Sequence, residues 1–473
     1  MRMAQIGIIG LGVMGANIAR NFASKGIVTS VYNRSSEKTD ALLQEHGNEF
    51  LQGHANLADF LVSLEKPRKI LLMVTAGAPV DAVLEALTSL LAPGDIVIDG
   101  GNSLFSDTQR RTAQLAKAGI HYIGMGISGG EEGALHGPSM MAGIGNELGQ
   151  QGMASDMVLK ELLEKATARD FTNGPCLGWF GGAGSGHYVK MIHNGIEYAI
   201  MELIAETYQL LRKAYQLSPD QIAQLFAQWQ KGKLNSYLID ITAQVLAKKD
   251  DFGDGFLIDK IKDQAGQKGT GQWTVQDAFS RGIPVPSIVT AVEARQISSF
   301  RSIRVRLAQQ YPFGKNNSIQ LPPYEQLEDM LFSGIVLCYI QGLTLIATTA
   351  KEQSWHIDLS EVIRIWQGGC IIRATLLTNI SNWLKNISAE QHLLEIPAVK
   401  EILLPYMSLW PEYLNMAMVC HVPLMGYQAS YQYLLAMTEE QCSANLIQGL
   451  RDFFGAHTYE RLDKEGIFHT VWE

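Results

Sequence analysis

A glycine-spaced turn near the amino terminus limits the fold of this chain more than any other stretch. It lies within AQIGIIGLGVMGANIARNFASKG, residues 4–26, where an apolar run typical of a buried strand is followed by a helical segment. Gly10 permits a tight turn, Gly12 lets the backbone approach a pyrophosphate, and Gly15 allows close packing of helix on strand. This context predicts a dinucleotide-binding βαβ unit, with phosphates at the helix amino terminus. A tight turn without a ligand is the alternative.

The same alternation of strand and helix continues through the first 130 residues. Its short apolar runs are QIGIIG, VTSVYNR, KILLMV, DIVIDGG and HYIGMGISGG. They predict parallel βαβ units that bind ligands at the carboxyl ends of their strands. After about residue 180 the spacing becomes helical, as where Ser218 is a predicted N-cap and Pro219 the first helical residue. We therefore expect a Rossmann-type α/β domain (1–180), a large all-α domain (181–440) and a carboxyl-terminal tail (441–473).

Two short motifs in the helical part are similar to each other. LFAQWQKG (225–232) and VIRIWQGG (362–369) share a Trp-Gln-x-Gly ending and lie 137 residues apart. An internal repeat of a helical unit and chance similarity are equal alternatives at this stage.

Composition excludes several classes of protein. The net charge is −9 over 473 residues and no basic run occurs, which argues against a nucleic-acid or anionic-membrane partner. The uncharged stretch 334–350 is short for a membrane span, so we interpret it as a buried core helix. Five scattered cysteines without CxxC spacing indicate buried free thiols in a reducing compartment. Because the first strand begins almost at once, we expect no signal peptide and a cytoplasmic location.

The end of the second predicted strand distinguishes between dinucleotides. An NAD site would place a carboxylate there for the ribose 2′-hydroxyl, but the strand ends VYNRSSEK, with Asn33, Arg34 and Ser35. A guanidinium can bind a 2′-phosphate through two hydrogen bonds, so the predicted cofactor is NADP. The cofactor-binding residues predicted from these two motifs are Gly10, Leu11, Gly12, Val13, Met14, Gly15, Asn33, Arg34 and Ser35.

The stretch KMIHNGIEYAI, residues 190–200, combines a polar and an apolar helix face. The polar face holds positions i, i+3, i+4 and i+7, namely Lys190, His193, Asn194 and Glu197. The opposite face holds Ile192, Ile196, Ala199 and Ile200. Lys190 and Glu197 lie ~10 Å apart along the axis, within reach of one small molecule. A lysine base requires a lowered pKa, from burial or nearby cations, and a glutamate acid requires a raised one. Pairing of the two across a domain boundary is the alternative.

Further motifs follow in order along the chain. They are DGGNS (99–103), SGGEEGALHGPS (128–139), GGAGSGHYVK (181–190), AGQKGTGQWT (265–274), GCIIR (369–373) and ANLIQGLRDFFGAHTYERLDKEGIFHT (444–470). Each glycine cluster taken singly is typical of a tight loop. Taken together, and nearly from end to end, they resemble the 6-phosphogluconate dehydrogenase family, the decarboxylating enzymes of the pentose phosphate pathway.

The resemblance implies an activity and a mechanism. The reaction would be NADP-dependent oxidative decarboxylation of 6-phosphogluconate to ribulose 5-phosphate and CO2, without a metal. Lys190 would act as general base on the C3 hydroxyl and then donate to the C3 oxygen as CO2 leaves. Glu197 would protonate C1 of the enediol. The resemblance also implies a homodimer in which each tail completes the site of the partner subunit.

The remaining site residues are also implied by the resemblance. Those expected to hold the carboxylate and hydroxyls of the sugar acid are Asn102, Ser128, Gly129, Gly130, His193 and Asn194. Those expected to hold the 6-phosphate are Tyr198, Lys268, Thr270 and Arg295. The tail would add Arg451 and His457 from the partner subunit. The cofactor set would gain Val74, Thr75 and Asn102.

The chain departs from the family pattern at a few positions. Thr75 stands where a lysine is usual, Ala142 and Ile144 interrupt GPSMMAGIG, and Ala429 stands where an aspartate is common. The first is expected to weaken cofactor binding, and the second to alter a loop beside the substrate. Two other functions are also considered: a β-hydroxyacid dehydrogenase that releases no CO2, and a non-catalytic NADP-binding homologue.

Overall fold

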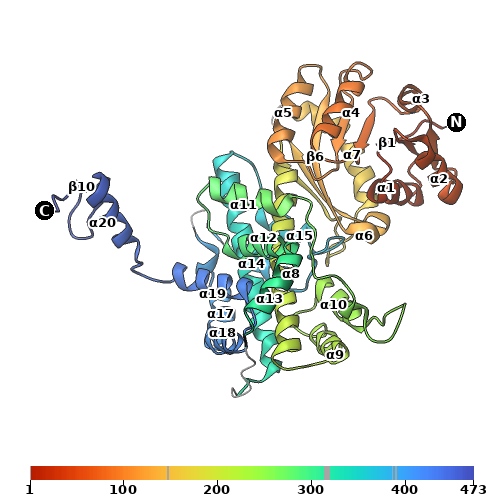
Figure 1. Cartoon of the computed structure of the whole chain (residues 1–473). Coiled ribbons are helices and arrows are strands. Elements are labelled where there is room, and N and C mark those ends of the chain that lie inside the picture. The colour runs from red at the N-terminus through yellow and green to blue at the C-terminus, as the bar shows by residue number, and fades with distance from the viewer. Residues whose placement is uncertain (1, 146–148, 314–319, 386, 389–390, 473) are drawn as a thin grey trace.

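The computed structural model describes residues 2–145, 149–313, 320–385, 387–388 and 391–472 (Figure 1). The predicted outer domain limits, Met1 and Glu473, lie outside these residues. An eight-stranded sheet occupies the amino-terminal part, in the order β3-β2-β1-β4-β5-β6-β7-β8. Its strands are β1 (Ile6–Ile9), β2 (Thr29–Tyr32), β3 (Leu51–His54), β4 (Lys69–Leu72), β5 (Ile96–Asp99), β6 (His121–Ser128), β7 (Ser139–Ile144) and β8 (Leu177–Gly181).

Helices cover both faces of this sheet. They are α1 (Val13–Ser24), α2 (Ser36–His46), α3 (Leu57–Val62), α4 (Ala78–Thr88), α5 (Phe105–Ala116), α6 (Gly130–His136) and α7 (Gly149–Ala166). On β1, Ile8 belongs to the core beneath α1, whereas Ile9 belongs to the core on the other face. A parallel sheet buried on both faces requires such continuous apolar strands. The Rossmann-type α/β part followed by a mostly helical part is therefore confirmed.

The five predicted strand runs correspond to β1, β2, β4, β5 and β6, and they pair parallel as expected. The next strand, β7, was not predicted and pairs in the other direction. β6 and β7 run antiparallel, with Gly124 opposite Gly143 and Ser128 opposite Ser139. The connecting segment 129–138 is too short for a parallel crossover, which needs about a dozen residues or more. The predicted loop containing Ala142 is therefore a strand, on which that residue is buried opposite Met125. Ile144 is the last residue of the same strand, and Gly182 donates to its carbonyl oxygen.

The carboxyl-terminal part is built around two long helices, α8 (Ser185–Lys213) and α14 (Leu327–Glu352). The segment 324–352 is long and apolar enough to span a membrane by composition, yet 89% of its apolar window is buried inside the protein. The prediction of a buried core helix is confirmed. The other α-helices of this part are α9 (Pro219–Trp229), α10 (Tyr237–Ala247), α11 (Thr270–Ser280), α12 (Pro286–Ser299), α13 (Arg301–Gln310), α15 (Leu359–Ile365), α16 (Leu376–Leu384), α17 (Pro397–Tyr406), α18 (Leu409–Val419) and α19 (Met425–Met437).

The two similar motifs occupy corresponding places in this helical part. One ends α9 and the other ends α15, and an extended turn follows each. The two turns pair antiparallel, since the Tyr237 N–H donates to the Arg373 carbonyl and the Thr375 N–H donates to the Asn235 carbonyl. They lead into α10 and α16 respectively. This pairing favours an internal repeat over chance similarity.

Helix α8 joins the sheet to the helical part. At Gly126 on β6, an added Cβ would lie 2.2 Å from the Cβ of Lys190, so glycine is what allows the helix to approach the sheet. Near the other end of α8, the Glu206 carboxylate accepts the backbone N–H groups of Gly426 (2.7 Å) and Tyr427 (3.0 Å) at the start of α19. One helix therefore contacts both the sheet and the last helix before the tail.

The tail forms a small unit that lies apart from the body, at the end of an extended segment (Figure 1). It contains α20 (Ala444–Gly455) and a hairpin of β9 (Tyr459–Glu460) and β10 (Ile467–Phe468). Its exposed apolar residues are Leu446, Ile447, Leu450, Phe453, Phe454, Leu462, Ile467, Val471 and Trp472.

The five cysteines are free, as predicted, but they are not all buried. Cys176, Cys338 and Cys370 are buried, whereas Cys420 is half-buried and Cys442 is exposed. Cys442 lies in the connection between the end of α19 at Met437 and the start of α20 at Ala444.

Candidate active site

The polar face of α8 forms one connected row of side chains, as the helical spacing predicts. Lys190 Nζ donates to Asn194 Oδ1 at 2.8 Å and lies 3.4 Å from His193 Nδ1. The same ring nitrogen lies 3.9 Å from Glu197 Oε2. Lys190 and His193 are buried, while the Glu197 side chain is 15% exposed. An ammonium group and a carboxylate are thus held on one stripe, in partial shelter from solvent.

Burial shifts the pKa values in this row in the directions that favour the neutral forms. Burial lowers the pKa of Lys190, while the neighbouring Glu197 and Cys370 act in the opposite direction. Burial likewise raises the pKa of Glu197, against the charges of Lys190 and Arg295. The pKa of His193 lies well below its usual value because of burial and the Lys190 charge. These are the directions that a lysine base and a glutamate acid require, and burial rather than a nearby cation lowers the pKa of the lysine.

The carboxyl end of β6 forms one wall beside this row. Ser128 Oγ lies 3.2 Å from His193 Nε2. Gly129 follows with φ +136°, and an added Cβ would lie 2.5 Å from the carbonyl oxygen of Gly369. Gly130 also has a positive φ, +61°. The loop that carries the three predicted β6 residues is therefore fixed directly against the row.

The segment 366–370 was not predicted as part of the site. The Trp366 ring packs edge-on against His193 at a centroid distance of 5.4 Å, and Cys370 lies close enough to Lys190 to influence its pKa. The Trp-Gln-Gly-Gly motif was the available signal, but it was interpreted only as a repeat. The helical part thus supplies a second wall of the site.

The residues expected to bind the 6-phosphate lie toward the Glu197 end of the row. Asn194 Nδ2 donates to Thr270 Oγ1 at 3.1 Å, at the first residue of α11. The Arg295 guanidinium on α12 stacks on the Tyr198 ring at 3.5 Å. Lys268 is exposed just before α11. The four residues come from three helices and one loop, and their donors and cationic groups suit an anion.

The predicted dinucleotide cradle is present at the ends of β1, β2 and β4. Gly10 has φ +100°, and an added Cβ would lie 2.5 Å from the carbonyl oxygen of Met73. The Leu11 N–H donates to Asn33 Oδ1 at 2.9 Å, which joins the first loop to the end of β2. No described side chain caps the start of α1, so its first N–H groups, at Val13 and Met14, are free to bind a phosphate. The residues present fit a dinucleotide.

The first turn of α2, just after β2, contains a carboxylate that the sequence did not identify as part of the cofactor site. Ser35 Oγ donates to Glu37 Oε2 at 2.5 Å, in the first turn of α2. This hydrogen bond lowers the pKa of Glu37, so the group is ionised near neutral pH. Arg34 is exposed beside it. A cation and an anion therefore share the position where a 2′-phosphate is expected.

Asn102 is predicted to bind both cofactor and substrate. The residues before and after it both donate hydrogen bonds to one buried carboxylate. The Gly101 N–H donates to Asp99 Oδ1 at 3.1 Å, and Ser103 Oγ donates to Asp99 Oδ2 at 2.6 Å. Tyr122 also donates to Asp99 Oδ2, at 2.8 Å. Asp99 is fully buried at the end of β5, whereas Asn102 is exposed. The backbone on both sides of Asn102 is therefore fixed, while its side chain is exposed.

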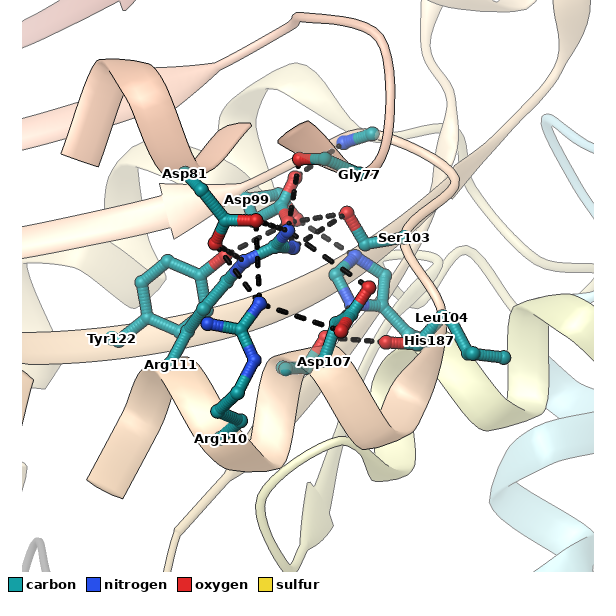
Figure 2. Close-up of polar contacts among 12 residues, drawn as sticks. Gly77, Asp81, Asp99, Ser103, Leu104, Asp107, Arg110, Arg111, Tyr122 and His187 are labelled. Carbon is teal, nitrogen blue, oxygen red and sulfur yellow. Dashed lines mark hydrogen bonds and ion pairs between the residues drawn. The ribbon is translucent and has the colours of Figure 1, made fainter. Parts of the chain in front are cut away.

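Arg111 connects this loop to the one after β4, as Figure 2 shows. The Arg111 side chain is 1% exposed and makes a bidentate ion pair with Asp81, with distances of 2.8 and 3.1 Å. It also donates to the Gly77 carbonyl at 3.0 Å and lies 3.6 Å from Asp99 Oδ2. Val74 and Thr75 lie on the loop that ends at Gly77. Neither this arginine nor Asp81 carried a local sequence signal, because the partners lie 30 residues apart.

The network reaches α8 through one histidine. His187 Nε2 lies 3.0 Å from the Asp99 carbonyl oxygen, and Thr108 Oγ1 lies 2.7 Å from His187 Nδ1. His187 is one helical turn before Lys190. The cofactor loops and the polar row of α8 are therefore linked by direct contacts.

Two predicted residues do not reach this site within the subunit. Arg451 and His457 lie on the tail, where both are exposed, and Arg451 Nη1 donates to Gln448 Oε1 at 3.0 Å. The tail lies apart from α8 (Figure 1).

Comparison with known proteins identifies the family. The NAD binding domain of 6-phosphogluconate dehydrogenase matches residues 5–168, and the 6-phosphogluconate dehydrogenase C-terminal domain matches residues 186–472. The NADP(+)-dependent, decarboxylating 6-phosphogluconate dehydrogenase of Bacillus subtilis (strain 168) is 43% identical over 478 residues, covering 100% of both chains. The decarboxylating enzyme of Lactococcus lactis subsp. lactis (strain IL1403) is 42% identical over 475 residues, covering 100% of this chain and 99% of the relative.

A solved structure agrees with the sequence comparison. The 6-phosphogluconate dehydrogenase of Plasmodium falciparum, described in apo form and in complex with NADP+ and with 6-phosphogluconate, superposes with a TM-score of 0.92. It is 38% identical and covers 99% of this chain and 100% of its own. The resemblance that the motifs indicated is confirmed. This chain belongs to the 6-phosphogluconate dehydrogenase family.

Proposed function

We propose that this chain catalyses the NADP-dependent oxidative decarboxylation of 6-phosphogluconate, with Lys190 and Glu197 as its acid–base pair. The observation that carries this proposal is the buried row on α8, in which burial lowers the pKa of the lysine and raises that of the glutamate. Relatives that match the whole chain are decarboxylating 6-phosphogluconate dehydrogenases, and one of them is named as NADP(+)-dependent. Their decarboxylating activity argues against a β-hydroxyacid dehydrogenase that releases no CO2.

The acid–base steps follow from the geometry of the row. NADP, when bound, accepts the hydride from C3 of the sugar acid. Neutral Lys190 takes the proton of the C3 hydroxyl and returns it to the C3 oxygen as CO2 leaves from C1. The electron pair of the broken bond stays on the neighbouring carbon, which becomes C1 of the enediol. Protonated Glu197 then delivers its proton to this carbon, while neutral Lys190 takes back the proton of the former C3 oxygen, which becomes the C2 carbonyl of ribulose 5-phosphate.

The remaining residues position the two ends of the substrate. Asn102 and the Ser128–Gly130 loop suit the carboxylate and hydroxyls, together with His193 and Asn194. The stacked guanidinium of Arg295 suits the 6-phosphate, with Thr270 and Lys268 as further donors. We assign no metal ion to the reaction, because the Lys190 ammonium can polarise the developing C3 oxygen.

We also propose that the enzyme is a homodimer located in the cytoplasm. The tail exposes aromatic and aliphatic side chains and cannot reach the site of its own subunit in the arrangement described, so docking on a second copy would bury them. Free cysteines, one of them exposed, suit a reducing compartment.

A turnover assay tests the activity. Purified protein is supplied with 6-phosphogluconate and NADP, with and without EDTA, and NADPH and CO2 are measured together. We expect equal amounts of both products. NADPH without CO2 would indicate a non-decarboxylating dehydrogenase, neither product would indicate a non-catalytic homologue, and loss of both only on adding EDTA would contradict metal independence.

The variant Lys190→Ala tests the role of the lysine. It should abolish oxidation while leaving the Kd for NADP nearly unchanged, because the dinucleotide cradle is built from other residues. Equal losses of turnover and NADP affinity would instead mean that Lys190 supports the structure.

A further inference from the structure

One carboxylate organises the tail. Asp452 is fully buried, although the residues around it on α20 are exposed. Its Oδ1 accepts the Thr458 N–H at 3.0 Å and lies 2.8 Å from His469 Nδ1. Its Oδ2 accepts the Thr470 N–H at 3.1 Å and the Trp472 Nε1–H at 2.9 Å. Both oxygens are therefore used, by donors from the turn after α20 and from the end of the chain.

These hydrogen bonds hold the hairpin against the helix. The strands β9 and β10 contain two residues each, and an isolated hairpin of that size is not stable in water. Most large apolar residues of the tail are exposed, so burial of apolar surface contributes little. Burial alone would raise the pKa of Asp452, but the hydrogen bonds from His469, Thr470 and Trp472 bring it down to about 2. The group is ionised near neutral pH, when its acceptor strength is greatest.

The hydrogen bond between Asp452 and Thr458 joins positions next to the two tail residues assigned to the substrate. Asp452 directly follows Arg451, and Thr458 directly follows His457. The residues on either side of His457 both have left-handed backbone conformations, with φ +52° at Ala456 and +60° at Thr458. Such conformations cost about 1 kcal/mol or more for residues with a Cβ. They persist only where surrounding contacts impose them, and the Asp452–Thr458 hydrogen bond is such a contact.

We infer that Asp452 is a positioning residue that fixes Arg451 and His457 in one arrangement before the tail reaches the partner subunit's site. This inference rests on the proposed function, because it takes the tail to be part of a shared site. A tail ordered in advance loses less conformational entropy when it docks, and so binds substrate more tightly.

The variant Asp452→Asn tests this role. If the single amide oxygen accepts the Thr458 N–H, the amide nitrogen faces the Thr470 and Trp472 N–H groups and cannot accept from them. The hydrogen bonds that hold the end of the chain are therefore lost. We expect the KM for 6-phosphogluconate to rise about tenfold or more, because small misplacements of binding groups have effects of up to about a hundredfold. The Kd for NADP and the unfolding of the body should not change. Asp463→Asn is the matched control, since Asp463 lies on the same hairpin but is exposed and bonded to Arg461.

Co-expression identifies the subunit in which Asp452 acts. Lys190→Ala paired with Asp452→Asn gives mixed dimers with one site that combines an intact Lys190 and an intact tail. Recovered activity with the wild-type KM supports the inference. An unchanged substrate KM in the Asp452→Asn homodimer overturns it, as does a rise equal to that of Asp463→Asn. If Lys190→Ala with Arg451→Ala also recovers nothing, the shared site itself is wrong and the inference falls with it. If only the Asp452→Asn pair fails, the shared site stands and Asp452 does not act from the tail.

Discussion

At the scale of single residues, burial or exposure of a charged group determines how strongly its surroundings change it. Lys190 and Glu197 have unremarkable side chains, but burial in the row on α8 shifts both toward their neutral forms. At the other end of the site, Arg34 and Glu37 are exposed, so solvent screens their charges and their effects are smaller. The two ends of the site therefore call for different measurements.

The pH dependence of kcat should report the acid–base pair. Below the pKa of Lys190 the base is protonated, and above the pKa of Glu197 the acid is ionised, so kcat should fall at both extremes. Glu197→Gln should lower kcat by ~10²–10⁴ and remove the alkaline fall while keeping the acid one. Stopped-flow kinetics over a pH series checks this. Wild-type kcat, or an unchanged alkaline fall, would exclude Glu197 as the acid.

Cofactor selectivity should depend on two neighbouring residues with opposite signs. Arg34→Ala should weaken NADP by about 1.5–3 kcal/mol and leave NAD nearly unaffected, because one charge-assisted contact to the 2′-phosphate is lost. Glu37→Gln should tighten NADP by about two- to fivefold, because it removes an exposed like charge and releases the Ser35 hydroxyl. Calorimetric Kd values for both cofactors test the pair. Equal effects on NADP and NAD would show that neither residue contacts that phosphate.

At the scale of helices and strands, contacts within one element could be predicted from the sequence, whereas contacts between elements could not. The row on α8 could be predicted because helical spacing is a local property. The antiparallel β7 could not, since the direction of pairing depends on the length of the connection before it. The contacts of Arg111 with Asp81 and Gly77 could not be predicted either, because they join elements far apart in sequence. The Gly10 turn was identified because its function requires a nearly fixed sequence.

The loops after β4 and β5 should depend on Arg111 and not on the arginine beside it. Arg111→Met should destabilise the protein by about 3 kcal/mol and weaken NADP binding, because it removes the cation beside buried Asp99 and the hydrogen bond to the Gly77 carbonyl. Arg110→Met is the control, since the Arg110 side chain is 51% exposed although it pairs with the same Asp81; its effect should stay within about 1 kcal/mol. Urea unfolding and NADP titration measure both. Similar results for the two variants would show that the buried network is not what holds these loops.

At the scale of the whole molecule, the residues of the proposed site are divided between parts that lie far apart in one subunit. The sheet provides the cofactor cradle, the helical part provides the polar row, and the tail with Arg451 and His457 extends away from both (Figure 1). The buried helix α14 supports the middle of this arrangement. In the proposed dimer, the tail of a second copy would complete the site.

Mixing of inactive variants tests that division. Lys190→Ala and Arg451→Ala should each be nearly inactive alone. Co-expressed at equal levels, half of the dimers are mixed, and each mixed dimer has one site with both residues intact. Roughly a quarter of the wild-type activity should return, by random two-fold assembly. No recovery would place both residues in the site of a single subunit.

Helix α8 has three functional contacts at fixed positions along its axis. His187 contacts the Asp99 loop, the row from Lys190 to Glu197 forms the proposed substrate site, and Glu206 caps α19. An α-helix turns by about 100° per residue, so inserting or deleting one residue between Glu197 and Glu206 would rotate one set of contacts away from its partner. Substitutions within this stretch can be compensated locally, but changes of length cannot. We therefore expect insertions and deletions to be tolerated in the exposed segment 251–255 and to abolish activity within α8, and a scan of single-codon indels would show the boundary.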